Sequence, residues 1–322
     1  MAYGSIGAND GAVLNGTVDR ELFQKKAATD VLKYFQSTNV ARPLITNDSI
    51  ESGKSKSFPI VGNAEASSRK EAVITDLGDK SINATEREII IGDLTVAHSW
   101  LSDLDEAMAH YNSKAAQIES IGRALAKKVD QDIILKVIEA AGVVDAAAAT
   151  TAGLRDFSTN GDDVFTAKSE RDIVSVSGVA TGEEVFLSMA AAMTEFRDKD
   201  AVGDPVFLLR PQHYFALLNN AQNSGVTWIS DPHAQSGRVP MVLGSKVVYS
   251  PHFPAFVGTT GVTNCVGLLF AKECAGILEL LSVNVRVDYI PQKLAYLMAG
   301  KMAVGYGILN HGSAITFGFV NP

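Results

Sequence analysis

The residues whose types and spacing could support chemistry are few and isolated. Gly53-Lys54-Ser55 matches the end of a phosphate-binding loop, but Asp48 stands where that motif has its first glycine. Pro59 follows where the motif needs a helix. No G-x-S-x-G nucleophile elbow is present either. The sequence therefore predicts neither a nucleotide site nor a hydrolase nucleophile.

Cysteine and histidine residues do not form a site. Cys265 and Cys274 are too few for a disulfide framework or a zinc site, and we expect two buried thiols. The six histidines show no metal-ligand spacing. His252 lies in a turn between two prolines, where a hydrogen-bonding role is a better interpretation than catalysis. We therefore predict no catalytic residue, no cofactor-binding residue and no metal ligand, and a protein that is not an enzyme.

Composition narrows the classes further. The 322 residues carry a net charge of −8, which disfavours a phosphate-neutralising, nucleic-acid-binding surface. Charged residues make up 20%, below the roughly 25% usual in soluble domains, and mean hydropathy is +0.10. No run approaches the roughly 18 apolar residues of a membrane-spanning helix, and the N-terminal residues do not resemble a secretory signal. What remains is a large soluble protein whose surface is short of charge.

The first hundred residues predict an arm followed by a long hairpin. Helical spacing predicts a helix over Asp19–Gln36, and residues 51–62 read as one extended strand. A polar segment without periodicity, residues 63–86, separates it from a second strand region over residues 88–100, where apolar residues alternate with polar ones. Hairpin loops normally have 2–5 residues. This hairpin has little core of its own, so it is either disordered or packed on something else.

The strongest periodicity lies in residues 103–141, where apolar positions recur every three or four residues and predict one helix of about 58 Å. Residues 142–180 have little pattern. Residues 181–280 alternate between helix and strand signals and predict a compact α/β unit, with helices over residues 181–198 and 211–222 and strands over residues 206–210, 241–248 and 266–270. Four strands, Val283–Tyr289, Lys293–Met298, Met302–Leu309 and Ala314–Val320, are predicted beyond it.

Several blocks of sequence carry a resemblance to a known family. They are residues 50–62 (Ile-Glu-Ser-Gly-Lys-Ser-Lys-Ser-Phe-Pro-Ile-Val-Gly), 89–97, 103–111, 243–254, 301–307 and 310–312. In this order they resemble the major capsid protein of short-tailed, podovirus-type bacteriophages. Residues 142–180 do not match clearly.

The resemblance implies an α+β fold, the tailed-phage major capsid fold of the Hong Kong ninety-seven type. In that fold the extended loop lies across a neighbouring subunit, which would give the long hairpin its packing surface. The implied parts are an N-arm (1–48), an extended loop (49–101), a spine helix (102–142), an irregular insertion (143–180), an axial domain (181–280) and the β-rich end of a peripheral domain (281–322).

The implied function is that of a structural subunit that self-assembles into pentamers and hexamers of an icosahedral shell around double-stranded DNA. The subunit would be assembled in the cytoplasm of the host bacterium and located in the virion. Its partners would be copies of itself, a scaffolding protein, a portal, a decoration protein and DNA enclosed without specific binding, with no membrane. Two alternatives stay open: an encapsulin-like compartment shell protein, and a cytosolic α/β enzyme with its site in residues 181–280. The residues predicted to contact other subunits are Lys54, Phe58, Ile60, Leu94, Val96, Trp100, Arg123, Lys127 and Lys128.

Overall fold

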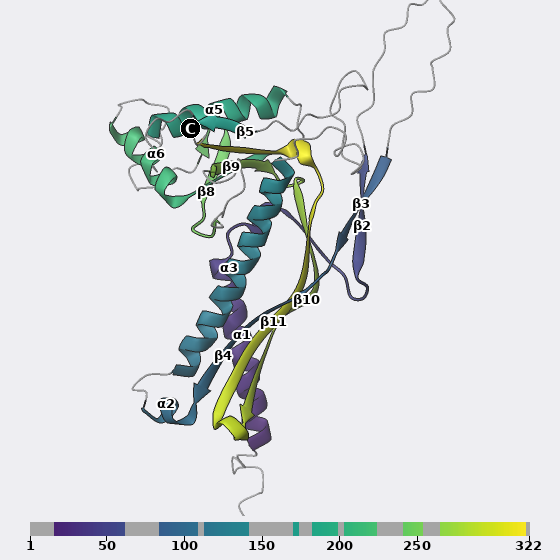
Figure 1. Ribbon diagram of the computed structural model, residues 1–322, viewed down its shortest axis with the longest axis vertical. Helices are drawn as coiled ribbons and strands as arrows, with labels where there is room; N and C mark the ends of the chain where they lie inside the picture. Colours follow the sequence, from purple (N-terminus) through teal and green to yellow (C-terminus); the bar gives the residue numbers. More distant parts are fainter. Residues whose placement is uncertain are drawn as a thin grey trace, which may run out of the picture. The chain divides into compact units, whose positions relative to one another are not determined.

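The computed structural model describes residues 16–61, 84–108, 113–141, 170–173, 182–198, 203–223, 241–253 and 265–319 (Figure 1). The chain divides into two compact units. Unit 1 contains residues 1–38, 94–126 and 281–302, and unit 2 contains residues 39–93, 127–280 and 303–322. Among the described residues, no helix is long and apolar enough to cross a membrane.

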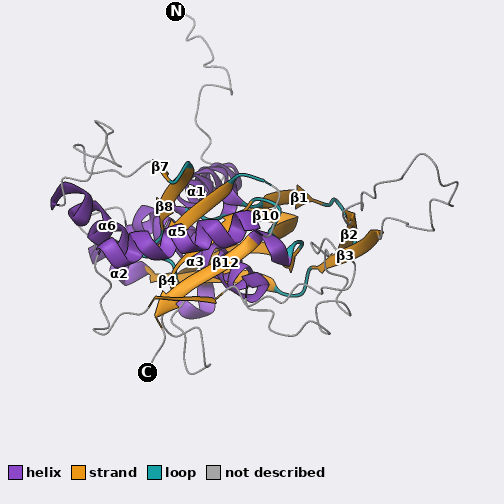
Figure 2. Cartoon of the chain, turned by 90° about the horizontal axis from the view of Figure 1, so that it is seen from above, coloured by secondary structure: helices purple, strands orange, loops and turns teal. Residues whose placement is uncertain are grey.

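Unit 2 is built on a six-stranded mixed sheet in the order β5-β12-β9-β6-β8-β7. Its strands are β5 (Glu170–Ile173), β6 (Pro205–Leu209), β7 (Met241–Val242), β8 (Ser245–Tyr249), β9 (Cys265–Ala271) and β12 (Ala314–Phe319). Strand β6 is parallel to β8 and antiparallel to β9. Helix α6 (Pro211–Asn223) follows β6 in the chain. Helix α5 (Gly182–Asp198) contacts β12 and β5 (Figure 2).

The core of this sheet unit explains why α5 forms where helical spacing predicts it. Val185, Met189, Ala192 and Phe196 recur every three or four residues and are fully buried. They join one cluster with apolar side chains of β6, β9 and β12. The strands are apolar on nearly every residue because their sheet is covered.

A second part of unit 2 holds the ribbon formed by β2 (Ser55–Val61) and β3 (Ala84–Ile90), which are antiparallel. Strand β1 (Thr46–Ser49) is parallel to the start of β10 (Ala275–Ile290). A short helix, η1 (Arg42–Leu44), precedes β1. The backbone amide of Ile91 donates to the carbonyl of Lys54 at 2.8 Å and extends the pairing beyond Ser55 and Ile90, at the end of the ribbon where β2 begins and β3 ends.

Unit 1 combines helix α1 (Gly16–Thr38) with strand β4 (Leu94–Ser102) and parts of α3 (Ser113–Ala141), β10 and β11 (Ala295–Ile308). Strand β4 is at one edge of the sheet β1-β10-β11-β4. Helix α1 approaches α3 closely at Gly122, where an added Cβ would lie 2.9 Å from the carbonyl oxygen of Val31. Of the apolar residues whose spacing predicts this helix, Ala27, Val31 and Phe35 are buried on α1, whereas Leu32 is 36% exposed.

The single helix predicted over residues 103–141 is wrong in its first part. The described residues form α2 (Asp103–Met108) and α3, with residues 109–112 outside the described residues. The short α2 does not extend the axis of α3 (Figure 1). Its start is fixed by the amide of Asp103, which donates to the carbonyl of Leu294, and by the hydroxyl of Ser102, which accepts from the amide of Asp105. These contacts fix the start of α2, and the ammonium of Lys114 on α3 pairs with the carboxylate of Glu106 on α2 at 2.5 Å.

Strand boundaries differ from the sequence prediction in five places. The strand predicted over residues 51–62 begins only at Ser55, because Gly53 takes a φ of 113°. Residues 88–100 form two strands in different sheets, since β3 ends at Ile90 and β4 begins at Leu94.

The later strands differ from the prediction as well. Residues 241–248 form the hairpin β7–β8 around Leu243 and Gly244, which both have positive φ. The strands predicted over residues 293–298 and 302–309 are one strand, β11. Strand β10 starts at Ala275, eight residues before the prediction of Val283.

Two predicted segments also belong elsewhere. Strand β12 pairs with β9 and β5, so the last strand joins the six-stranded sheet rather than β10 and β11. Residues 170–173 of the predicted irregular insertion form β5 of the same sheet. The other residues of the insertion, as well as most of the polar segment 63–86, lie outside the described residues.

Candidate inter-subunit surfaces

The β2–β3 ribbon has two unlike faces. Residues directly opposite each other in an antiparallel pair project from the same face. One face therefore carries Lys56 with Ile89 and Phe58 with Arg87, and the other carries Ser57 with Glu88 and Pro59 with Glu86. The first face, the inward face, packs within the chain. Ile89 is 1% exposed and belongs to an apolar cluster with Leu278 and Leu309, and Phe58 packs against this cluster.

Charge on the inward face is also satisfied within the chain. The ammonium of Lys56 lies 2.5 Å from the carboxylate of Asp48. This hydrogen bond, with a second one from the amide of Ser49, lowers the pKa of Asp48 below its ordinary value. Lys56 also lies 5.9 Å from the centre of the Phe58 ring. Of the predicted loop contacts, Phe58 is therefore half-buried by its own subunit, Lys54 is exposed, and the side chain of Ile60 lies outside the described residues.

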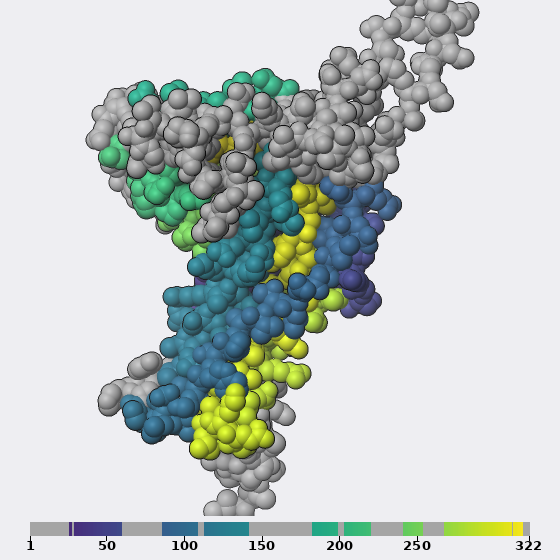
Figure 3. Space-filling view, viewed as in Figure 1, coloured from purple at the N-terminus to yellow at the C-terminus, as the bar shows by residue number. Residues whose placement is uncertain are grey.

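Strand β4 presents an apolar row to solvent. Leu94, Val96 and Trp100 are 49%, 50% and 39% exposed, and they alternate with half-buried residues as the sequence predicts. Lys293 places its ammonium 4.2 Å from the centre of the Trp100 ring. The surface of β4, in blue, is uncovered in Figure 3. Three large apolar side chains on one edge strand form a surface that a partner could bury.

The basic residues predicted on α3 are all exposed, although two of them have partners on the same helix. Arg123 pairs with Glu119, and Lys128 lies 2.7 Å from Asp132. Lys127 is exposed and has no carboxylate partner among the described residues. Such exposed pairs one turn apart contribute only about 0.3–0.5 kcal/mol. They leave the cations available to another surface.

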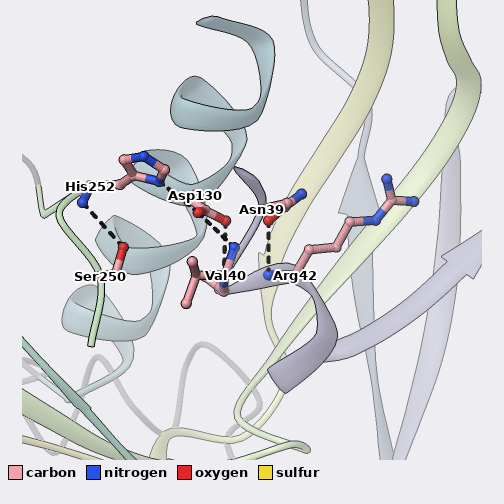
Figure 4. A network of polar contacts seen from close by, with 7 residues as sticks. Asn39, Val40, Arg42, Asp130, Ser250 and His252 are labelled. Atoms are coloured by element: carbon pink, nitrogen blue, oxygen red, sulfur yellow. Dashed lines mark hydrogen bonds and ion pairs between the residues drawn. The ribbon is translucent and has the colours of Figure 1, made fainter. Parts of the chain in front are cut away.

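Asp130, on the buried side of α3, holds a network that the sequence analysis missed (Figure 4). Its carboxylate is fully buried and accepts from the amides of Val40 at 2.9 Å and Ala41 at 3.0 Å. His252 Nδ1 lies 2.8 Å from the same carboxylate, so this nitrogen carries the proton. His252 thus has the hydrogen-bonding role predicted for it. The sequence did carry one signal for this network, because Asp130 is an acidic residue among the apolar positions of the predicted helix, where a charge needs partners.

Two described groups that could act as nucleophile or base, Cys274 and His213, are buried. Burial of the Cys274 thiol raises its pKa far above the ordinary value, so it stays protonated. Burial and then the charge of Arg210 lower the pKa of His213 to about 4. Among the described residues, no three metal-ligating side chains lie close enough to hold an ion. The side chain of Cys265 lies outside the described residues.

The fold defines the class of protein. The chain is similar to the capsid of cyanophage P-SCSP1u, with a TM-score of 0.68 and 23% identity over 88% of this chain and 89% of the other. It thus has the α+β fold of tailed-phage capsids, the Hong Kong ninety-seven type. The model of the Gp10A-like family, described as major capsid protein, matches residues 57–317, so the chain belongs to that family.

Curated relatives agree with the family. The chain is 25% identical to the major capsid protein of Enterobacteria phage T3 over 96% of this chain and 94% of that protein. It is 24% identical to the major capsid protein of Escherichia phage T7 over 96% of this chain and 95% of that protein. The chain is therefore a structural subunit of a phage capsid, located in the virion, and not an enzyme. The comparisons give no support to a compartment shell or to an α/β enzyme.

Proposed function

We propose that the chain assembles into the pentamers and hexamers of an icosahedral shell that encloses double-stranded DNA without binding its sequence. The observation that carries this proposal is the apolar row of β4, where Leu94, Val96 and Trp100 stay 39–50% exposed in a subunit of a shell-forming family. The negative charge of the chain supports a container that DNA can enter and leave, because it offers few phosphate contacts.

The proposed division of labour follows the family's fold. Residues 1–48 act as N-arm, 49–101 as extended loop, 102–142 as spine helix and 181–280 as axial domain. Residues 281–322 complete the peripheral domain, except that β12 belongs to the sheet of unit 2. A scaffolding protein, a portal and a decoration protein are the further partners of the proposal.

The predicted contact residues have different roles in the proposal, some in direct contact with a neighbouring copy and one indirect. Leu94, Val96 and Trp100 would be buried against a neighbouring copy, and Arg123, Lys127 and Lys128 would meet its acidic groups. Lys54 and Ile60 remain proposed loop contacts. Phe58 would contribute indirectly, since it packs on its own subunit and fixes the orientation of the ribbon.

Expression of the full chain with its scaffolding protein tests the proposal. We expect closed particles in electron micrographs and a rapidly sedimenting species. Val96→Asp should prevent closed particles while leaving a folded subunit, and Leu187→Asp, the same kind of change at the 59% exposed side chain on α5, is the matched control. A discrete 34 kDa species at high concentration with scaffolding protein would contradict the proposal.

A further inference from the structure

The last residues of β3 lie directly on three glycines of the strands β10 and β11, which we call the glycine seat: Gly276, Gly305 and Gly307. A Cβ added to Gly305 would lie 2.7 Å from the backbone carbonyl oxygen of Ile90, and one added to Gly307 would lie 2.5 Å from Ile89 Cγ1. At Gly276 the distance to Ile89 Cδ1 would be 3.0 Å. Non-bonded heavy atoms do not pack this closely, so β3 fits here only because these three positions lack a side chain.

Apolar side chains hold β3 in the seat. Ile89 and Ile91 are 1% and 6% exposed, and both belong to one apolar cluster with Leu278, Ala303 and Leu309. The ion pair between Lys56 and Asp48 also ties the ribbon to its own subunit, but both side chains are partly exposed. Burial of two large apolar side chains contributes more than such an ion pair. Packing in the glycine seat is therefore the main contact that orients the ribbon.

The chain segments that join the ribbon to the rest of unit 2 do not fix a direction by themselves. Beyond the hydrogen bond between Ile91 and Lys54 these segments are residues 51–53 and 92–93, and each contains a glycine. Gly53 takes a φ of 113°, and a Cβ added to Gly92 would meet no atom within 4 Å. Glycine joints allow many backbone directions, and a two-stranded ribbon is marginally stable unless one face packs. The direction of the ribbon therefore depends on the seat.

We infer that the glycine seat sets the direction in which the ribbon leaves the subunit, and that accurate assembly depends on this direction. The inference rests on the proposed function, because the direction matters only where the ribbon meets a second copy. The seat holds the ribbon over Ile89–Ile91, a span of about 7 Å, whereas the ribbon extends about 23 Å to Ala84. The ribbon thus acts as a lever on a short base.

The lever makes small displacements in the seat large at the far end of the ribbon. A methyl group at Gly305 or Gly307 would push β3 away by about 1 Å, to ordinary van der Waals distance. A displacement of that size at one end of the base moves the far end by about 3 Å. Interfaces between proteins pack as closely as protein interiors, so a displacement of this size prevents a matched fit.

A set of glycine substitutions tests the inference. Gly305→Ala and Gly307→Ala should each lower the yield of closed particles at least tenfold, measured by sedimentation and electron microscopy of the full chain expressed with its scaffolding protein. Gly92→Ala is the matched control, because its φ is not positive and its new methyl group meets no atom within 4 Å. This variant should assemble like the unmodified chain.

Hydrogen exchange of the unassembled variants separates a displaced ribbon from an unfolded subunit. In Gly305→Ala and Gly307→Ala, exchange should become faster in residues 84–91 and stay unchanged in β6 and β9. Should these variants not fold, Ile89→Ala empties the seat from the ribbon side without adding an atom, and the same two results are expected of it. Folded seat variants that assemble like Gly92→Ala, or whose residues 84–91 exchange at the unmodified rate, would overturn the inference.

A double variant sharpens the test. Ile89→Ala removes the Cγ1 and Cδ1 atoms that a methyl group at Gly307 would meet. The losses of particle yield caused by Ile89→Ala and Gly307→Ala should therefore be less than multiplicative when the two are combined. Fully multiplicative losses would count against the seat. Failure of the unmodified chain to form particles would instead count against the proposed function.

Discussion

The sheet of unit 2 and strand β4 of unit 1 bury their apolar side chains in different ways. Around the sheet, α5 supplies four fully buried side chains and the strands meet them from the other side. On β4, Leu101 is 3% exposed while Leu94, Val96 and Trp100 stay substantially uncovered. The first region is complete within one chain, whereas the second leaves three large apolar side chains uncovered, as the proposed contact with a neighbouring copy requires. Substitutions should therefore change subunit stability in the first and assembly in the second.

The largest effect is expected in the sheet core. Phe207→Ala should lower the free energy of unfolding of the unassembled subunit by about 3–5 kcal/mol, because the ring is fully buried and packs edge-on against Phe317 with centroids 6.2 Å apart. Urea titration of the subunit measures the loss. Leu187→Ala, on the exposed side of α5, is the control and should change stability by less than about 0.5 kcal/mol.

Acid should weaken the same core through His213. Its folded pKa of about 4 lies below the unfolded value of 6.5, so the unfolded chain binds more protons between these values. The contribution of neutral His213 to the free energy of unfolding is fully present above pH 6.5. It decreases as the pH falls towards 4, by up to roughly 3 kcal/mol in total. Urea titrations across this range measure the slope. His213→Gln should remove this part of the slope, and an unchanged slope would refute the role of His213.

A smaller loss is expected at the Asp130 network. Asp130→Asn should cost about 1–3 kcal/mol, because an amide offers one acceptor oxygen where the carboxylate serves three donors, Val40, Ala41 and His252. Thermal unfolding of the subunit measures it. The control Asp132→Asn removes a carboxylate of the same helix that pairs with exposed Lys128, and a similar loss for both variants would contradict the prediction.

The smallest effect on the subunit is expected at β4. Leu94→Ala should lower the free energy of unfolding by only about 1 kcal/mol, since its side chain is already 49% exposed. The same variant should lower particle yield in sedimentation assays. If Leu94→Ala weakened the subunit as much as Phe207→Ala, β4 would be part of the core and the contrast between the two regions would disappear.

Local periodicity accounts for how much of the fold was predictable. Helices α1, α5 and α6 and strands β6 and β9 follow patterns that short stretches of sequence carry by themselves. The exposed alternation of Leu94, Val96 and Trp100 was predictable for the same reason. Pairing between distant segments was not: nothing in residues 314–319 indicates β9 rather than β11 as neighbour. Likewise, the division of residues 88–100 between two sheets depends on contacts made elsewhere in the chain.

The candidate surfaces were predictable only as residue types. Sequence could mark Phe58 as a large apolar residue on a strand, but the register with Arg87 and the burial of Ile89 decide that its face points inward. Asp130 shows the converse. Its neighbours Val40 and His252 are far from it in sequence, so its role depends on folding that periodicity does not report.

The partial exposure of the β4 row has a consequence for how accurately subunits are placed during assembly of the shell. Covering the remaining half of each of three side chains would gain only about 1 kcal/mol apiece. A contact between subunits worth roughly 3 kcal/mol forms and dissociates readily. A subunit added in the wrong orientation can therefore dissociate before further neighbours hold it in place. Permanence then comes from the number of contacts around a finished ring rather than from the strength of any one of them.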